Sequence, residues 1–328
     1  MHLSTFVTKT SAILFLYSPL ASNLLCKLKT QKHFGLEVVI VYENKDIYSM
    51  KNFLYILLLA VATASAVGTS KPDFLKHRLL SEIKTVAPGQ TFTVALFLDH
   101  DETFHTYWQN PGTVGLATSL EWNLPTGFKA GPIQWQVPGK VKMVIYDAHG
   151  YNSDATLLVD ITAPETLPED EVKLEAKAVW MVCGPEPKQC CNMGFKNLSL
   201  KLKTSVSTEW DEAGRSQIAE ARRRLPQVLD GWEQTAKLIG EKVVLSVRNA
   251  KGLPVPIDKK LYFYSKLNHF TTLVEQESEV ERNELRISLP VADYAPEKIG
   301  ELVGLLFHPR GWPGTNGKKY MPVSLSLK

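Results

Sequence analysis

The 328-residue sequence predicts a mainly β protein, with an antiparallel β-sandwich over residues 67–205, a linker helix over 206–228 and a second, smaller β-domain over 229–328. Two observations support this prediction. Short segments with apolar residues at every second position recur between Pro- and Gly-rich turns, which is typical of strands that bury one face. A single segment, 207–225, interrupts this pattern with the composition of a helix.

The segment 50–66 has the features of a secretory signal peptide. Lys51 provides a positive charge at its start, Phe53–Ala62 is a short apolar run, and Ala64-Ser65-Ala66 matches the small-x-small pattern of a cleavage site. The apolar run is shorter than a membrane span requires. We therefore expect export to the periplasm with cleavage near Ala66.

The position of the signal predicts that Met50 is the true start and that residues 1–49 are an upstream extension. The competing interpretation makes Ala12–Cys26 a first membrane anchor, but Pro19 and several polar residues interrupt that run. Of the 37 basic and 34 acidic residues, six Lys and three acidic residues lie in residues 1–66, and the other 31 basic and 31 acidic residues balance. A neutral body gives no electrostatic reason to expect nucleic-acid binding.

Strands are predicted in the first domain wherever apolar and polar residues alternate. One or two strands are expected between Phe74 and Leu98, with a turn at Pro88-Gly89. The later strands are expected at Ala155–Ile161, Lys173–Cys183 and Asn197–Lys203. Turn-rich aromatic blocks lie between them, and we interpret their large rings as sandwich core: Tyr107, Trp108, Trp122 and Trp135.

The helix expected over 207–225 has capping residues at Ser207 and Thr208, acidic residues in its first turn and Pro226 after its end. We interpret Arg222–Arg224 as a solvated helix end. In the second domain, strands are expected at Val243–Val247, Lys260–Tyr264, Leu285–Leu289 and Val303–Phe307. This domain contains no cysteine and no cluster of titratable residues, so we expect no chemistry there.

Three of the four cysteines lie within nine residues, at Cys183, Cys190 and Cys191, between two predicted strands. Removal of Cys26 with the leader leaves an odd number in an exported chain, which suggests a free thiol, an intermolecular bond or a redox role. Cys183 can pair with Cys190 or with Cys191 across the tip of a hairpin, whereas a bond between the adjacent Cys190 and Cys191 would be strained.

The spacing of the cysteines alone favours a structural staple and a redox pair equally, and the third cysteine favours exchange because a thiol beside a disulfide can attack it. A third alternative is a Cu(I) site built from the cysteines with Met181, Met193, His105 or His149. The sequence contains neither paired C-x-x-C motifs nor a histidine at ligand spacing, so we predict no metal. We interpret His105 and His149 as ordinary loop residues.

Several blocks occur together in an order that is characteristic of one family. They are His105-x-Tyr107-Trp108-x-Asn110-Pro111-Gly112, Trp122-x-x-Pro125-x-Gly127, Gly131-x-Ile133-x-Trp135, Gly150-Tyr151 and Val179-Trp180-Met181-Val182-Cys183. Over most of residues 75–205 the chain thus resembles the N-terminal domain of the DsbD/ScsB-type thiol:disulfide interchange proteins. Glu220–Pro226 and the second β-region also resemble the part that follows this module in ScsB-like members.

The resemblance implies an immunoglobulin-like β-sandwich that relays electrons through a cysteine pair, with no cofactor and no small-molecule substrate. The implied partners are a membrane electron-transfer protein and periplasmic thioredoxin-like or thiol proteins, as in cytochrome c biogenesis. The family's first cysteine maps onto Cys183, so we expect loss of Cys183 to abolish mixed disulfides with partners. A non-catalytic binding or assembly module with a structural disulfide is the alternative.

The resemblance also implies two sets of residues around the cysteines. By position, Tyr146–Tyr151 would form a cap loop over the pair, with Tyr146, His149 and Tyr151 as its principal side chains. The supporting residues would be His105, Trp108, Asn110 and Trp180. The chain departs from the family in the longer loop that ends at Cys190-Cys191. It also ends at Lys328 without the family's multi-helix membrane and thioredoxin-like domains, so we expect a stand-alone module or separately encoded partners.

Overall fold

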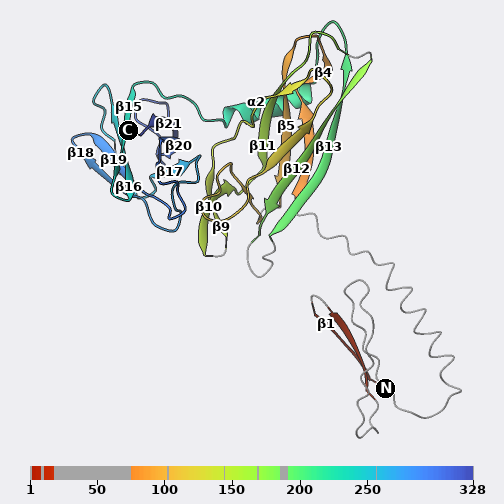
Figure 1. The fold of residues 1–328 in the computed structure, drawn as a ribbon, viewed down its shortest axis with the longest axis horizontal. Coiled ribbons are helices and arrows are strands. Elements are labelled where there is room, and N and C mark those ends of the chain that lie inside the picture. The colour runs from red at the N-terminus through yellow and green to blue at the C-terminus, as the bar shows by residue number, and fades with distance from the viewer. Residues whose placement is uncertain are drawn as a thin grey trace, which may run out of the picture. The chain divides into compact units, whose positions relative to one another are not determined.

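A computed structural model describes residues 2–8, 11–17 and 75–327, apart from residues 102, 144, 168–169, 185–190 and 256 (Figure 1). The chain divides into two compact units, Met1–Lys71 and Pro72–Lys328. In the first unit, β1 (His2–Thr8) and β2 (Ser11–Tyr17) form an antiparallel hairpin. The predicted signal peptide and Cys26 lie outside the described residues. Among the helices that the structure describes, none is long and apolar enough to cross a membrane.

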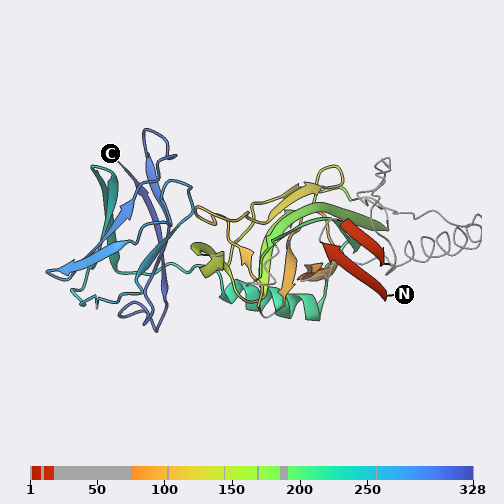
Figure 2. The ribbon, with the colours of Figure 1, turned by 90° about the horizontal axis from the view of Figure 1, so that it is seen from below.

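The first sheet of the sandwich is antiparallel, with the strand order β3-β5-β11-β8. Its strands are β3 (Leu75–Ser81), β5 (Thr91–His100), β11 (Ala155–Thr162) and β8 (Lys129–Ala130). The central strands β5 and β11 are buried on both faces, because one face points into the sandwich and helix α2 (Glu212–Arg223) packs on the other (Figure 2).

The second sheet has the order β14-β4-β13-β12-β7. Its strands are β14 (Glu209–Trp210), β4 (Ile83–Val86), β13 (Asn192–Thr204), β12 (Glu171–Val182) and β7 (Ser119–Asn123). The long strands β12 and β13 lie side by side and pair without a break from Glu171–Lys203 to Val182–Asn192 (Figure 1). Every even-numbered residue of β12 is buried, as its alternating sequence predicts.

The inner faces of the two sheets meet in a shared apolar core. Phe92, Ile161 and Leu174 belong to one part of this core, and Leu157 and Trp180 belong to the part that lies toward the cysteines. The predicted mainly antiparallel β-sandwich is confirmed, with one exception in the pairing of the strands. The short pair β13–β4 is parallel.

A small third sheet has the order β6-β10-β9 and lies at the end of the sandwich where β12 finishes. Its strands are β6 (Thr106–Tyr107), β10 (Tyr146–Tyr151) and β9 (Gly139–Met143). Gly150 is required where β10 crosses β6, because a Cβ atom at this position would lie 2.1 Å from the carbonyl oxygen of Thr106. This sheet brings the hairpin β9–β10 close to the cysteines.

Helix α2 is shorter than the sequence predicts and begins at Glu212, with Asp211 as its N-cap. Two of the residues expected in its first turns, Glu209 and Trp210, instead form β14 and pair with β4. The end of the helix is not purely solvated, because the Arg222 guanidinium lies 3.1 Å from the buried carboxylate of Glu82.

The C-terminal part of the chain contains two further sheets, ordered β15-β16-β19-β18 and β17-β20-β21. Their strands are β15 (Trp232–Ile239), β16 (Lys242–Asn249), β17 (Tyr262–Ser265), β18 (Glu277–Glu281), β19 (Glu284–Pro290), β20 (Glu301–Phe307) and β21 (Tyr320–Ser326). Apolar residues from both sheets, including Leu245, Phe263 and Leu306, form a core of their own. We call residues 232–326 the C-terminal β-region.

Candidate functional site

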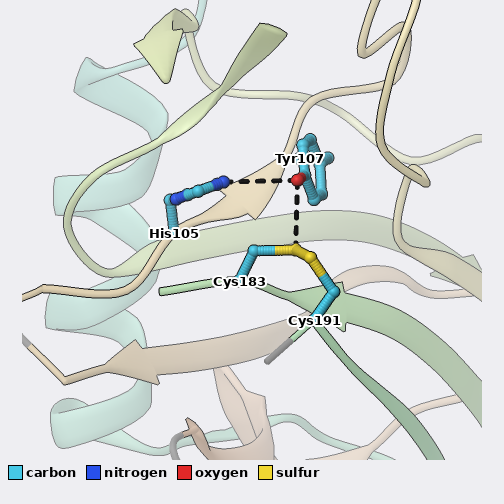
Figure 3. The surroundings of a disulfide bond; sticks show 4 residues. All are labelled: His105, Tyr107, Cys183 and Cys191. Carbon is cyan, nitrogen blue, oxygen red and sulfur yellow. Dashed lines mark hydrogen bonds between the residues drawn. A yellow bond between two sulfur atoms is a disulfide. The ribbon is translucent and has the colours of Figure 1, made fainter. Parts of the chain in front are cut away.

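The structure joins Cys183 and Cys191 in a disulfide, with 4.2 Å between their Cα atoms (Figure 3). Cys183 directly follows β12 and Cys191 directly precedes β13. The two cysteines are brought together because the last pair of this ladder, Val182 and Asn192, places the next residue of each strand opposite the other. The sequence left Cys190 and Cys191 as equal candidates; Cys190 lies outside the described residues.

The two cysteines differ strongly in exposure. Cys183 is only 2% exposed, whereas Cys191 is exposed. Cys183 is buried because its main chain forms a β-bridge with His105, through N–H···O hydrogen bonds of 2.9 and 3.0 Å in the two directions. An external thiolate therefore meets Cys191 first, and Cys183 is the buried partner.

A tyrosine hydroxyl is hydrogen-bonded to the buried sulfur. The Oη of Tyr107 donates to Sγ of Cys183 over 3.2 Å, and Nε2 of His105 lies 3.2 Å from the same Oη (Figure 3). The two residues are spaced by two on an extended segment, which places their side chains on one face. Since the hydroxyl hydrogen points to sulfur, the proton between His105 and Tyr107 must be carried by Nε2.

Burial keeps both members of this pair neutral near pH 7. It lowers the pKa of His105 below its usual value and raises the pKa of Tyr107 to about 12. Tyr107 therefore remains a hydrogen-bond donor throughout the physiological range. A donor fixed on a buried sulfur stabilises the thiolate that forms when that sulfur leaves a disulfide. The sequence analysis treated Tyr107 as core, although its position two residues after His105 indicated a shared face.

The predicted cap segment is a strand and not a loop. Tyr146–Tyr151 forms β10, and its Ala148 packs with Val141 of β9, Tyr107 and Cys183 in one apolar cluster. The side chains that the sequence singled out point elsewhere: Tyr146 is partly exposed at the hairpin tip, His149 is buried against other residues, and the Tyr151 hydroxyl donates to the carbonyl of Gln136. The hairpin β9–β10 covers Cys183 through the small residues of one face.

Of the other predicted residues, His105 contacts the site through its main chain and through Tyr107. Trp180 lies in the sandwich core beside His77. Trp108 and Asn110 contact the C-terminal β-region, Trp108 by an edge contact with the ring of Tyr264 and Asn110 by hydrogen bonds to main-chain carbonyls. His105 and His149 are both buried, so the interpretation of these two as ordinary loop residues is wrong.

The donor set of this site suits sulfur chemistry. It consists of two joined sulfur atoms, a phenol and an imidazole, arranged so that one sulfur is reachable and the other is assisted as a leaving group. Within the described ranges of the chain, no three His, Cys, Asp or Glu side chains are grouped closely enough to hold a metal ion.

Comparisons with known proteins place the sandwich among characterised domains of similar sequence pattern and fold. Residues 72–201 match the family model described as thiol:disulfide interchange protein DsbD, N-terminal. The N-terminal periplasmic domain of ScsB from Proteus mirabilis has a similar structure, with a TM-score of 0.58 at 13% identity over 80% of this chain and 96% of that chain. BcpA, the major pilin subunit of Bacillus cereus, gives a TM-score of 0.24 at 10% identity, over 77% of this chain and 66% of that chain. No curated protein sequence matches this chain.

Proposed function

We propose that this chain passes electrons between partner proteins through Cys183 and Cys191, as a domain of the DsbD N-terminal family of thiol:disulfide interchange proteins, whose family model matches residues 72–201. The observation that carries this proposal is the unequal setting of the two cysteines. Cys191 is exposed, while Cys183 is buried under a hydrogen-bond donor. Exchange needs one reachable sulfur and one good leaving group, and this disulfide offers both.

Reduction of the disulfide begins when a thiolate of a reduced partner attacks Sγ of Cys191. The new sulfur–sulfur bond joins the partner to Cys191, the bond to Cys183 breaks, and Cys183 leaves as a thiolate that receives the Tyr107 hydrogen bond. The partner's second thiolate then attacks its own sulfur in the mixed disulfide and releases the Cys191 thiolate. Two electrons have moved to this protein, its two thiolates take up two protons from water, and the partner is left with a disulfide.

The onward step is the same chemistry in reverse. The Cys191 thiolate attacks a disulfide of the target protein, forms a mixed disulfide and expels one target thiolate. The Cys183 thiolate then attacks Sγ of Cys191, which restores the Cys183–Cys191 bond and releases the second target thiolate. These roles place Cys191 first in contact with the partner and make Cys183 the resolving residue.

The position of this disulfide in the fold supports an exchange role more than a structural one. The β12–β13 ladder is paired up to Val182 and Asn192, the residues adjacent to the two cysteines. A disulfide stabilises mainly by closing a loop in the unfolded chain, and this loop is short, with a sequence separation of eight. The position at the end of a complete ladder therefore favours exchange over a structural role.

We propose the periplasm as the compartment and propose a membrane electron-transfer protein and thioredoxin-like or other thiol proteins as partners. The signal-peptide pattern of residues 50–66 supports export. The similar ScsB domain is described as periplasmic.

The experiment that tests the function is a redox titration of the mature protein in glutathione buffers, combined with reduction by reduced thioredoxin as a probe. We expect rapid reduction by thioredoxin and a reduction potential less negative than about −300 mV, the range of exchange-active bonds. Substitution Cys190→Ser should leave the potential unchanged, because the bond joins Cys183 and Cys191. A potential more negative than about −300 mV would identify a structural bond and refute the proposal.

An apolar patch beside the exposed cysteine is suited to docking of the partner. Met193 and Phe195 of β13 are 41% and 62% exposed and follow Cys191 at alternate positions. They pair across the ladder with Met181 and Val179 of β12. We propose that a thiol protein attacking Cys191 covers this patch, because Met193 and Phe195 follow Cys191 at alternate positions and therefore lie on the same side of the strand as its sulfur.

Substitution Phe195→Ser should slow reduction by thioredoxin at least about fivefold, since Phe195 is the larger and more exposed apolar side chain of the patch and truncating an energetically central interface residue costs more than about 1 kcal/mol. The rate of reduction by dithiothreitol should stay unchanged, because a small thiol makes no such contact. The matched control is Leu238→Ser, which removes a 48% exposed apolar side chain from β15 of the C-terminal β-region. Stopped-flow rates with both reductants measure the effect, and equal slowing with both would contradict docking at this patch.

A further inference from the structure

We propose that the C-terminal β-region holds the hairpin β9–β10 over Cys183, so that Tyr262 and Thr272 act as positioning residues that determine how often this cysteine becomes reachable. The value of such protection to the cell rests on the proposed exchange function, because a resolving cysteine must stay shielded until Cys191 has reacted. The physical claim concerns only the exposure of Cys183 and can be tested without a partner protein.

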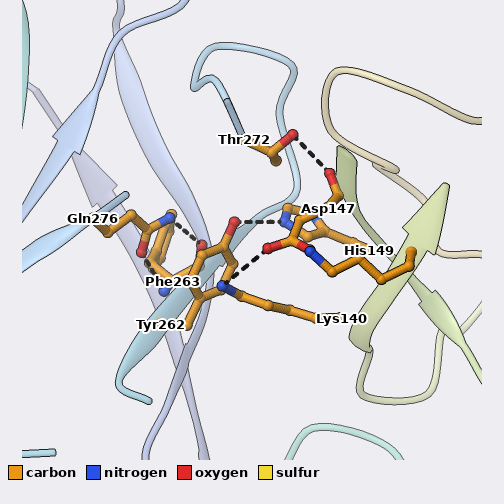
Figure 4. Close-up of polar contacts among 8 residues, drawn as sticks. Lys140, Asp147, His149, Tyr262, Phe263, Thr272 and Gln276 are labelled. Atoms are coloured by element: carbon orange, nitrogen blue, oxygen red, sulfur yellow. Dashed lines mark hydrogen bonds and ion pairs between the residues drawn. The ribbon is translucent and has the colours of Figure 1, made fainter. Parts of the chain in front are cut away.

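The hairpin lies between the disulfide and the C-terminal β-region, with one face toward each. Ala148 and Val141 are opposite each other in the ladder and pack on Cys183. The adjacent pair, His149 and Lys140, points the other way, because successive residues of a strand face opposite sides. Both of these side chains contact Tyr262 of β17 (Figure 4).

The contact between His149 and Tyr262 is a hydrogen bond whose donor and acceptor can both be assigned. Nδ1 of His149 lies 3.0 Å from the carbonyl oxygen of Asn110, which only accepts, so Nδ1 carries the hydrogen. Burial lowers the pKa of His149 to about 4, and the ring is neutral at pH 7. Nε2 therefore accepts the hydrogen of the Tyr262 hydroxyl, 3.0 Å away. Lys140 lies over the Tyr262 ring with its Nζ 4.1 Å from the centroid.

Further hydrogen bonds connect the same two parts along the length of the hairpin. Thr272 donates to the carbonyl oxygen of Asp147 over 3.0 Å (Figure 4), and Tyr320 donates to that of Pro138, directly before β9, over 2.7 Å. The side-chain amide of Asn110, in the segment after β6, donates to the carbonyls of Ser265 and Leu267, each over 2.9 Å. The C-terminal β-region thus contacts both segments that enclose Cys183.

Removing one of these bonds should make the hairpin open more often without touching the sulfur atoms. A buried residue reacts with a small reagent only while its cover is open, so its alkylation rate reports the population of the open state. Loss of a hydrogen bond of ordinary strength changes such a population about fivefold. Tyr262 is hydrogen-bonded to His149 and Thr272 to Asp147, and both acceptors lie on β10. Losing both hydrogen bonds should therefore open the hairpin further than losing either.

The test uses the mature protein with Cys190→Ser and Cys191→Ser, in which Cys183 is the remaining cysteine. In this background we expect Tyr262→Phe to raise the rate of Cys183 alkylation by iodoacetamide about fivefold, and Thr272→Val to raise it further in combination. The pH midpoint of alkylation should not move, because Tyr107 is untouched. The matched control is Tyr264→Phe, two residues along β17, whose hydroxyl makes no hydrogen bond within the described part of the chain.

Two outcomes would overturn the proposal. One is an unchanged alkylation rate in the Tyr262→Phe and Thr272→Val double variant, with the β-structure retained by circular dichroism. The other is an equal increase in the Tyr264→Phe control, which would show a general loss of packing. Thr272→Val alone preserves the shape of the side chain and provides the same test if the Tyr262 variant folds poorly. The two tests are independent. An unchanged alkylation rate would refute the role of the C-terminal β-region without changing the expected reduction potential, and a reduction potential that refutes exchange would not change the alkylation result.

Discussion

Substitution of Cys183 by serine should convert a transient intermediate into a stable mixed disulfide between Cys191 and the partner protein. The exposed Cys191 thiolate can still attack a disulfide of the partner, but the buried thiolate that would resolve the intermediate is missing. In a Cys190→Ser background, which removes the adjacent thiol, we expect mixed disulfide to rise from an undetectable amount to most of the protein. The probe is thioredoxin whose resolving cysteine is replaced and whose remaining cysteine is bonded to thionitrobenzoate. The Cys191 thiolate of the reduced protein attacks the thioredoxin sulfur, the mixed disulfide forms and thionitrobenzoate leaves. Acid quenching and non-reducing electrophoresis give the readout.

The matched variant is Cys191→Ser in the same background, which should form almost no mixed disulfide because its one remaining thiol lies under the hairpin β9–β10. Mass spectrometry of a tryptic digest locates the bonded cysteine in each case. This expectation reverses the one drawn from the sequence, in which loss of Cys183 abolishes trapping. The reason is the burial of Cys183 by its β-bridge to His105, a contact between residues 78 positions apart. Trapping by Cys191→Ser but not by Cys183→Ser would make Cys183 the cysteine that reacts first with the partner, as the sequence analysis expects.

The fold was predictable from the sequence where one face of a strand is buried. The alternation from Lys173 to Cys183 identified β12, whose even-numbered residues are all buried. The prediction missed the first five residues of β13, which begins at Asn192, because Phe195 and Met193 are apolar and exposed. Extending that strand to Asn192 would have placed Cys191 opposite Cys183.

The parts of the site that depend on long-range contacts could not be read from local patterns. Tyr107 reaches Cys183 across 76 positions of the chain, and His149 reaches Tyr262 across 113. Nothing in the sequence around Tyr262 indicates that its hydroxyl contacts a buried histidine, because His149 lies on β10, in a different sheet from β17. Trp210 was misplaced for a similar reason. Its pairing with Ile83 of β4 outweighs the helical composition of the residues around it.

The Tyr107 hydroxyl should have a large effect on the rate of exchange. In the disulfide it makes an ordinary hydrogen bond to Sγ of Cys183, but on the departing thiolate the bond becomes charge-assisted in a buried site. Hydrogen bonds to charged groups contribute about 1.5–3 kcal/mol, and 1.4 kcal/mol is a tenfold change in rate. We therefore expect Tyr107→Phe to slow reduction by dithiothreitol at least about tenfold. It should also move the pH midpoint of Cys183 alkylation upward by about one pH unit in the Cys190→Ser and Cys191→Ser background.

The control must lose a comparable hydroxyl that does not touch sulfur. Tyr151 meets this requirement, since it is buried in β10 and donates to the carbonyl oxygen of Gln136 over 3.0 Å. Tyr151→Phe should cost similar stability and leave the alkylation midpoint in place. His105→Ala should shift the midpoint in the same direction as Tyr107→Phe but by less, because it removes the donor behind the hydroxyl and leaves the hydroxyl itself. An unchanged midpoint in Tyr107→Phe, with the Tyr151→Phe control also unchanged, would show that the hydroxyl contributes packing and no stabilisation of the thiolate.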